Sequence, residues 1–148
     1  MIDISGKEVV LRTAVASGFI RLKGSTMSAI RDHSVKKGDV LEVARTAGMF
    51  AVKRTPETIP HCHNIPIESV RIDFVEKDDG IEARCRVSAH YRTGVEMEAL
   101  NGVSVALLTI WDMTKYLEKD DTGNYPSTRM SDIVVELKEK SDDRSQGT

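Results

Sequence analysis

The chain has 148 residues and a formal net charge of −2; hydrophobic residues make up 40% of it and charged residues 30%. This composition is typical of a globular domain that can bury a core, and it excludes an intrinsically disordered chain. The slightly negative charge argues against non-specific nucleic-acid binding, which depends on a broad basic surface. An anionic small molecule remains compatible, because it needs only a local cluster of cations.

Membrane and redox functions are disfavoured as well. No apolar run approaches the ~20 residues needed to cross a bilayer, and the N-terminus lacks the apolar stretch of a signal peptide. We therefore expect a cytoplasmic protein with no membrane partner. The two cysteines, Cys62 and Cys85, form no Cys-x-x-Cys pair. A disulfide framework or a cysteine-bound iron–sulfur cluster is therefore not expected.

The first part of the chain predicts one strand and two helices. Residues 8–22 mix aliphatic and polar side chains, which predicts a long, bent strand. Residues 26–33 predict a short helix. A stronger helix is predicted to begin after Asp39 as N-cap, with apolar residues at three- and four-residue spacing. It is predicted to end before Pro56, because a residue that precedes proline resists helical backbone angles.

Small residues and prolines mark two features of this region. Ala47, Gly48 and Ala51 make the apolar face of the second helix thin, so we expect another element to pack closely against it. Residues 56–66 carry three of the four prolines. They predict a stiff loop that can hold side chains in fixed positions.

The remainder of the chain predicts a hairpin, a long helix and a last strand. Residues 70–76 and 81–91 alternate apolar and polar side chains on either side of a turn at Asp78-Asp79-Gly80, which predicts a hairpin with one buried face. Apolar residues then recur at helical period. The predicted ranges are a helix over 95–118, a mobile polar loop over 119–128, a strand over 133–137 and a disordered polar tail over 141–148.

This order of elements, β-α-β-β-α-β, predicts a single ferredoxin-like domain over residues 1–148. Its class is α+β, with an antiparallel sheet that carries both main helices on one face. The other face of the sheet has to be covered, and we expect oligomerisation to cover it. The fold by itself says nothing about function.

Five blocks of residues carry the chemistry. In this order and spacing they resemble the cyclic pyranopterin monophosphate synthases, the molybdenum cofactor biosynthesis protein C family, over roughly residues 3–119. Each block alone is weak, but five in order are specific. The blocks are Lys37-Gly38-Asp39, Lys53-Arg54-Thr55, Ile59-Pro60-His61-Cys62-His63, Gly94-Val95-Glu96-Met97-Glu98-Ala99 and Asp112-Met113-Thr114-Lys115.

The histidine block has three interpretations from the residues alone. His61 and His63 could bind phosphate or transfer protons, because histidine titrates near neutral pH. They could hold a metal, although a structural zinc site needs a second ligand pair that the sequence lacks. They could also be incidental loop residues. The resemblance implies substrate binding by His61, Cys62 and His63, and no metal site.

The charged residues of the other blocks have alternatives too. Lys37, Lys53 and Arg54 are natural partners of a triphosphate, or they are solvated cations at the ends of helices. Glu96 and Glu98 are either acids favoured by the dipole at a helix start, or acceptors for the N–H donors on the edge of a guanine-like ring.

Asp112 and Lys115 lie three residues apart on the predicted long helix and share one face. They form either a surface ion pair worth under about 1 kcal/mol or an acid–base pair. Leu108, one turn earlier, favours a sheltered pair. Glu98 and Asp112 are separated by roughly 21 Å along this helix, which is too far for one pterin-sized substrate. If both serve one site, they come from different subunits, so we predict active sites at a subunit interface.

The resemblance implies a lyase that converts 3′,8-cyclo-7,8-dihydro-GTP to cyclic pyranopterin monophosphate and releases pyrophosphate. It implies no required cofactor, although Mg²⁺ could accompany the triphosphate. It also implies a homohexamer built as a trimer of dimers, and a radical-SAM GTP cyclase that supplies the substrate. The catalytic residues would be Asp112, Lys115 and Lys37. The substrate-binding residues would be His61, Cys62, His63, Met97, Glu98, Lys53, Arg54 and Glu96.

Two other functions remain open from the residues. A non-catalytic ferredoxin-like module that binds a nucleotide and regulates a partner would show ligand affinity without turnover. A metal-dependent phosphohydrolase would lose its activity to chelators and hold a metal at His61 and His63.

Overall fold

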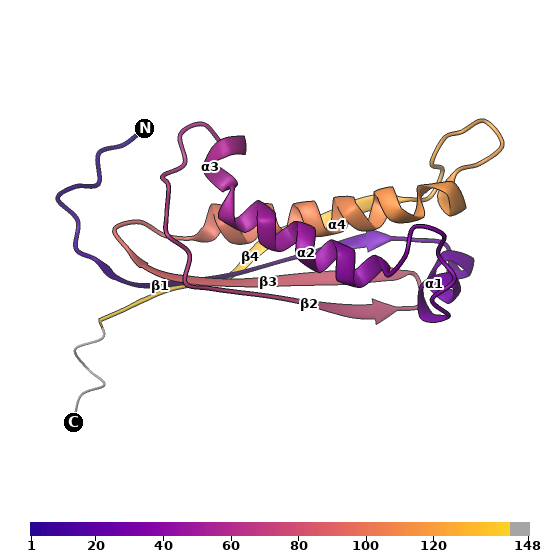
Figure 1. The fold of residues 1–148 in the computed structure, drawn as a ribbon, viewed down its shortest axis with the longest axis horizontal. Coiled ribbons are helices and arrows are strands. Elements are labelled where there is room, and N and C mark those ends of the chain that lie inside the picture. Colours follow the sequence, from indigo (N-terminus) through magenta and orange to yellow (C-terminus); the bar gives the residue numbers. More distant parts are fainter. Residues whose placement is uncertain (143–148) are drawn as a thin grey trace, which may run out of the picture.

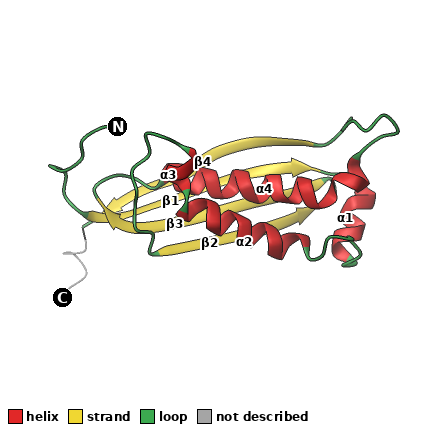
Figure 2. Cartoon of the chain, turned by 45° about the horizontal axis from the view of Figure 1, so that its top comes forward, coloured by secondary structure: helices red, strands yellow, loops and turns green. Residues whose placement is uncertain are grey.

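The computed structural model describes residues 1–142 and shows two layers (Figure 1). A four-stranded sheet forms one layer, and two helices run across one of its faces as the other layer (Figure 2). The elements in chain order are β1 (Val10–Arg21), α1 (Gly24–Arg31), α2 (Val40–Lys53), α3 (Thr55–Thr58), β2 (Ser69–Lys77), β3 (Gly80–Tyr91), α4 (Glu96–Glu118) and β4 (Arg129–Ser141).

The sheet confirms the ferredoxin-like prediction. Its strand order is β2-β3-β1-β4, and all three neighbouring pairs are antiparallel. In the central strand β1, Ala14 lies opposite Val87 of β3 and Lys138 of β4. Because alternate side chains of a strand point to opposite faces, Ala14 and Ala16 both face the helices, and both are fully buried.

The helices α2 and α4 pack closely where each carries a glycine. A Cβ added to Gly48 would lie 3.0 Å from the backbone oxygen of Gly102, and one added to Gly102 would lie 2.9 Å from Cys85 Sγ. The predicted close partner of the small-residue face of α2 is therefore α4. The approach of Gly102 to Cys85 places α4 close against β3.

The structure corrects three details of the predicted elements. The last strand begins at Arg129 and ends at Ser141, not at 133 and 137, and the predicted tail lies outside the described residues from 143 onward. The short helix α3 was not predicted. The loop over 119–128 has its own turn, in which the Asp120 side chain accepts hydrogen bonds from the backbone N–H groups of Thr122 and Asn124.

Charged side chains line the face of the sheet opposite the helices. Ion pairs cross it between Arg71 and Asp73, Lys77 and Glu82, and Arg84 and Glu136. Within residues 1–142 the helices α2 and α4 cover the other face and α1 lies at one end of the sheet (Figure 2), so the cover of the charged face by oligomerisation stays a prediction. In that same part of the chain, no helix has the length and apolar character that a membrane crossing requires.

The close packing at Gly48 gives a test of stability. We expect Gly48→Ala to lower the free energy of unfolding by about 1–3 kcal/mol, because the new methyl group meets the Gly102 backbone, which cannot easily move. Gly24→Ala, in α1, is the matched control because its Cβ would meet open space. Urea denaturation of both variants measures the difference, and equal stabilities would contradict the packing argument.

Candidate active site

Two ammonium groups converge on one carboxylate near the C-terminal end of α4. Lys37 Nζ lies 3.2 Å from Asp112 Oδ2 and donates to the Asp112 backbone oxygen at 2.8 Å. Lys115 Nζ lies 3.3 Å from Asp112 Oδ1. The structure therefore brings together all three residues that the sequence predicted as catalytic, although Lys37 comes from the loop before α2.

The electrostatics of this cluster keep the carboxylate ionised. Hydrogen bonds from Lys37 first, and then from Lys115, hold the pKa of Asp112 below its ordinary value. In the isolated chain the cluster is open to solvent: the Asp112 and Lys115 side chains are 59% and 43% exposed, and Leu108 is 57% exposed. The expectation that Leu108 shelters the pair is therefore wrong for one chain alone.

The local sequence fixes the backbone on which Lys37 lies. Gly38 has a φ of +112°, a conformation that glycine adopts without steric cost. Asp39 then caps α2, because its side chain accepts a hydrogen bond from the backbone N–H of Glu42 at 3.1 Å. The predicted N-cap is confirmed, and Lys37 lies two residues before it.

A second cluster lies at the N-terminal end of α4. Glu98 is 1% exposed, and Cys62 Sγ donates to its Oε1 at 3.6 Å. Its other oxygen, Oε2, is buried and has no hydrogen-bond partner among residues 1–142. Burial raises the pKa of Glu98, and burial together with the Glu98 charge raises the pKa of Cys62 to about 11. Glu98 is therefore not a solvated acid at a helix start; it has an acceptor available for a ligand's N–H group.

Both loop histidines contact the first two residues of the chain. His61 Nδ1 lies 3.0 Å from the N-terminal nitrogen of Met1, and His63 Nε2 lies 2.6 Å from the carbonyl oxygen of Ile2. His61 and His63 flank Cys62, the residue that contacts Glu98; His63 is half-buried, whereas His61 is exposed.

The other predicted binding residues occupy three different settings. Glu96 forms an ion pair with Lys138 of β4. Burial acts to raise the pKa of Glu96, but the hydrogen bond from Lys138 and the charges of Lys138 and Arg12 outweigh it, so the pKa is lowered overall. Met97 is exposed. At the end of α2, Lys53 is exposed, and the Arg54 guanidinium lies 5.2 Å from the centroid of the Phe50 ring. No contact recorded for residues 1–142 ties Lys53 or Arg54 to Glu98.

Sequence reasoning missed a cationic pocket next to Glu96. Lys7, Arg12 and Lys140 help to line a cavity of about 620 Å³, together with the acidic residues Glu8 and Asp142, so that basic groups outnumber acidic ones by one. In the pairing of β1 with β4, Arg12 lies opposite Lys140. Lys138 lies two residues earlier on β4, so its side chain points to the same face of the sheet as that of Lys140. The alternation of lysines at 138 and 140 was the available clue, but it required extending the last strand beyond residue 137.

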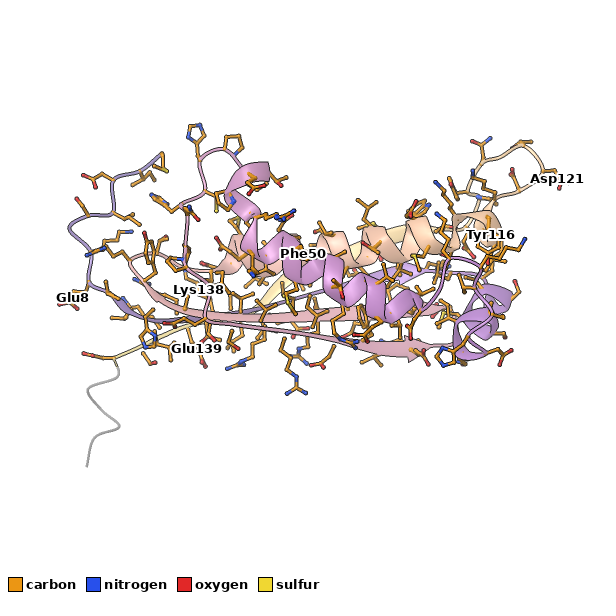
Figure 3. The ribbon with its side chains drawn as sticks, in the orientation of Figure 1. Glu8, Phe50, Tyr116, Asp121, Lys138 and Glu139 are labelled. Atoms are coloured by element: carbon orange, nitrogen blue, oxygen red, sulfur yellow. The ribbon has the colours of Figure 1, made fainter. Side chains whose placement is uncertain are left out.

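The two clusters lie at opposite ends of one uninterrupted helix. Figure 3 shows Tyr116 near the end of α4 that carries Asp112, and Lys138 toward the other end of the molecule, where Glu96 lies. Because α4 is continuous from Glu96 to Glu118, the predicted separation of roughly 21 Å between Glu98 and Asp112 holds within one chain.

The pKa shifts of Glu98 and Glu96 predict opposite effects on stability. Glu98 has a raised pKa when folded, so it contributes stability at low pH that is lost as pH rises through that value. Glu96 has a lowered pKa, so it contributes stability above its ordinary pKa that is lost as pH falls. When the pH rises from about 4 to about 7, the free energy of unfolding of Glu98→Gln should increase relative to that of the parent chain. The free energy of unfolding of Glu96→Gln should decrease relative to the parent over the same range.

Denaturation of both variants and the parent at the two pH values measures these differences. Each variant is compared with itself at the other pH, so any constant effect of the amide cancels. A pH effect of the same sign in both variants would contradict the assignment.

Comparison with known proteins gives consistent matches over nearly the whole chain. The MoaC family model matches residues 1–141. The probable cyclic pyranopterin monophosphate synthase of Aeropyrum pernix is 57% identical over 140 residues, which cover 95% of this chain and 96% of the relative. The protein of the same name in Thermococcus kodakarensis is 56% identical over 143 residues, which cover 97% of this chain and 92% of the relative.

Proposed function

Because the chain belongs to the MoaC family, we propose that it is a cyclic pyranopterin monophosphate synthase. In this proposal it converts 3′,8-cyclo-7,8-dihydro-GTP to cyclic pyranopterin monophosphate and releases pyrophosphate. The names of the archaeal relatives favour a synthase over a nucleotide-binding regulatory module or a phosphohydrolase. The observation that carries the proposal is the convergence of Lys37 and Lys115 on Asp112.

The proposed reaction moves protons and needs no redox step. One ring opens, the pterin ring forms, and a cyclic phosphate closes while pyrophosphate leaves. A positioned acid–base group contributes about 10²–10⁴-fold to such steps. We assign Lys115 as the acid–base group oriented by Asp112, and Lys37 as a second proton-transfer group, since the ionised carboxylate holds both ammonium groups in place.

The cluster at the other end of α4 suits the base of the substrate. The edge of a guanine-like ring presents adjacent N–H donors, and Glu98 Oε2 is a buried acceptor with no partner of its own among residues 1–142. Cys62 occupies the other oxygen and so leaves Oε2 for the ligand. Met97 is exposed in the same turn of α4, where it can line the base pocket.

The cations near Glu96 suit the triphosphate. Lys7, Arg12 and Lys140 line one cavity, and Lys and Arg are the usual partners of phosphate oxygens. We include His63 in this phosphate site because it follows Cys62, the partner of Glu98, and is half-buried on the same loop. Lys53, Arg54 and His61 remain predicted contacts, and a Mg²⁺ ion carried by the triphosphate is compatible with this arrangement.

The proposed assembly follows from the distance between the clusters. One substrate cannot reach from Glu98 to Asp112 of the same helix, so the Asp112 cluster of one subunit would complete the Glu98 cluster of another. We propose a homohexamer built as a trimer of dimers, in the cytoplasm, with a separate radical-SAM GTP cyclase that supplies the substrate.

Turnover of the cyclised dihydro-GTP tests the activity. We expect the parent chain to release the pterin and pyrophosphate together, and Asp112→Asn and Lys115→Ala to lower kcat by at least about 10²-fold. Lys119→Ala is the matched control, because Lys119 follows the same helix but lies over the Tyr125 ring. Substrate binding without product release in the parent chain would favour the regulatory module instead.

Mixed oligomers test the shared site. Asp112→Asn and Glu98→Gln chains should each be nearly inactive, but their co-expression should restore about a quarter of the parent activity if a site takes one cluster from each subunit. Oligomers of each single variant are the controls. If one chain supplied both clusters, no mixed oligomer would contain an intact site, and activity would stay at the level of the single variants.

A further inference from the structure

A second contact joins α4 to the loop over residues 32–39, beside the acid–base cluster. The backbone N–H of Lys36 donates to the Tyr116 hydroxyl oxygen at 2.7 Å, and Lys36 Nζ lies 5.5 Å from the centroid of the same ring. Lys37, the next residue, donates its Nζ to Asp112. Asp112 and Tyr116 are one helical turn apart and share a face of α4, so consecutive loop residues dock on neighbouring positions of the helix.

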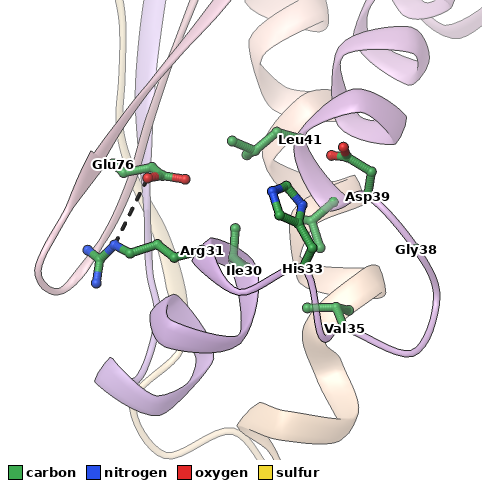
Figure 4. A pocket seen from close by; sticks show the side chains of 9 residues that line it. Ile30, Arg31, His33, Val35, Gly38, Asp39, Leu41 and Glu76 are labelled. Carbon is green, nitrogen blue, oxygen red and sulfur yellow. Dashed lines mark ion pairs between the residues drawn. The ribbon is translucent and has the colours of Figure 1, made fainter.

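The other side of this loop is hollow. His33, Val35, Gly38 and Asp39 line a cavity of about 220 Å³ between the loop, α1 and β2, and Figure 4 shows these residues around it. The β2 side of the cavity carries Glu76, which is paired with Arg31. The start of the loop is held to α1, because the backbone N–H groups of His33 and Ser34 donate to the carbonyl oxygens of Ile30 and Ala29. Nearer Lys37, the loop is held by its contact with α4.

Backbone placement matters because a lysine side chain is flexible. The Lys37 ammonium lies at the end of a flexible four-carbon stem, so holding it in one place costs rotamer entropy. The Asp112 contacts can hold the Lys37 ammonium only when the Lys37 backbone lies within reach of Asp112. The backbone on its C-terminal side is set by Gly38 and the Asp39 cap, and on its N-terminal side Tyr116 holds the Lys36 amide.

We propose that Tyr116 is a positioning residue, whose hydroxyl accepts the Lys36 amide hydrogen and thereby places the Lys37 ammonium on Asp112. The catalytic consequence of this contact rests on the proposed function, but the contact itself does not. Tyr116 would touch neither substrate nor reacting atoms, and it would act through Lys37.

Two consequences separate this role from simple structural support. Loss of the hydroxyl should lower kcat and leave KM nearly unchanged, since Lys37 is assigned to proton transfer. It should also raise the pKa of the Asp112 carboxyl toward its ordinary value, because the hydrogen bond from Lys37 is the largest cause of its lowering and Lys115 supplies the rest. Lys37, from the loop, and Lys115, from α4, are the charged groups that face this carboxyl.

The test is Tyr116→Phe, which keeps the ring under Lys36 and removes only the hydroxyl. We expect kcat to fall about fivefold, the effect of one ordinary hydrogen bond, with KM and Tm nearly unchanged. Tyr125→Phe is the matched control, because the Tyr125 ring packs against Trp111. Its kcat and KM should equal those of the parent chain. The pH at which activity is lost on the acid side should rise for Tyr116→Phe only.

A titration of the Asp112 carboxyl carbon by NMR tests the contact without any substrate. Tyr116→Phe should raise the Asp112 pKa in the parent background and should have no further effect in a Lys37→Met background, because the contact acts through Lys37. An unchanged Asp112 pKa, or an equal rise in both backgrounds, would overturn the proposal. If the titration behaves as expected but the parent chain shows no turnover, the proposed function fails and the positioning contact stands.

Discussion

The position of α4 on the sheet is the constraint from which both clusters follow. Gly48 brings α2 against α4, Gly102 brings α4 against β3, and on β1 a Cβ at Gly18 would lie 2.9 Å from Leu107 Cδ1. A glycine at each of these three contacts lets α4 lie close to its neighbours, and a closely packed interior leaves the helix little room to shift. The side chains at its two ends are then fixed by its length alone.

The end of α4 that carries the acid–base cluster has its own buried anchor. Glu118 is fully buried, and its carboxyl accepts hydrogen bonds from the Thr26 and Thr128 hydroxyls and the Lys23 backbone N–H. A buried carboxyl is costly unless such donors surround it. This residue therefore ties α4 to the start of α1 and to the residue before β4. Since α1 leads into the loop that carries Lys37, the anchor also fixes where that loop begins.

The sequence predicted what depends on neighbours along the chain. The strand alternation and the long helical period gave the ferredoxin-like order, and the spacing of Asp112 and Lys115 placed them on one face. The full length of β4 escaped prediction because its pairing with β1 is irregular on either side of Ala16, which breaks the alternation. The solvent exposure of Leu108, the burial of Glu98 and the pocket around Arg12 and Lys140 depend on tertiary contacts, which no local pattern records.

Glu98 Oε2, which has no hydrogen-bond partner among residues 1–142, limits which ligands the pocket accepts. With its pKa raised by burial, this carboxyl keeps its proton to a higher pH than an ordinary glutamate does. Its ionised form accepts hydrogen bonds, and its protonated form donates one. A ring edge made of N–H donors would bind the ionised form and drive off a proton, whereas an edge that offers a lone pair would bind the protonated form and take one up. The same buried oxygen thus favours different tautomers of a heterocycle on the two sides of its titration.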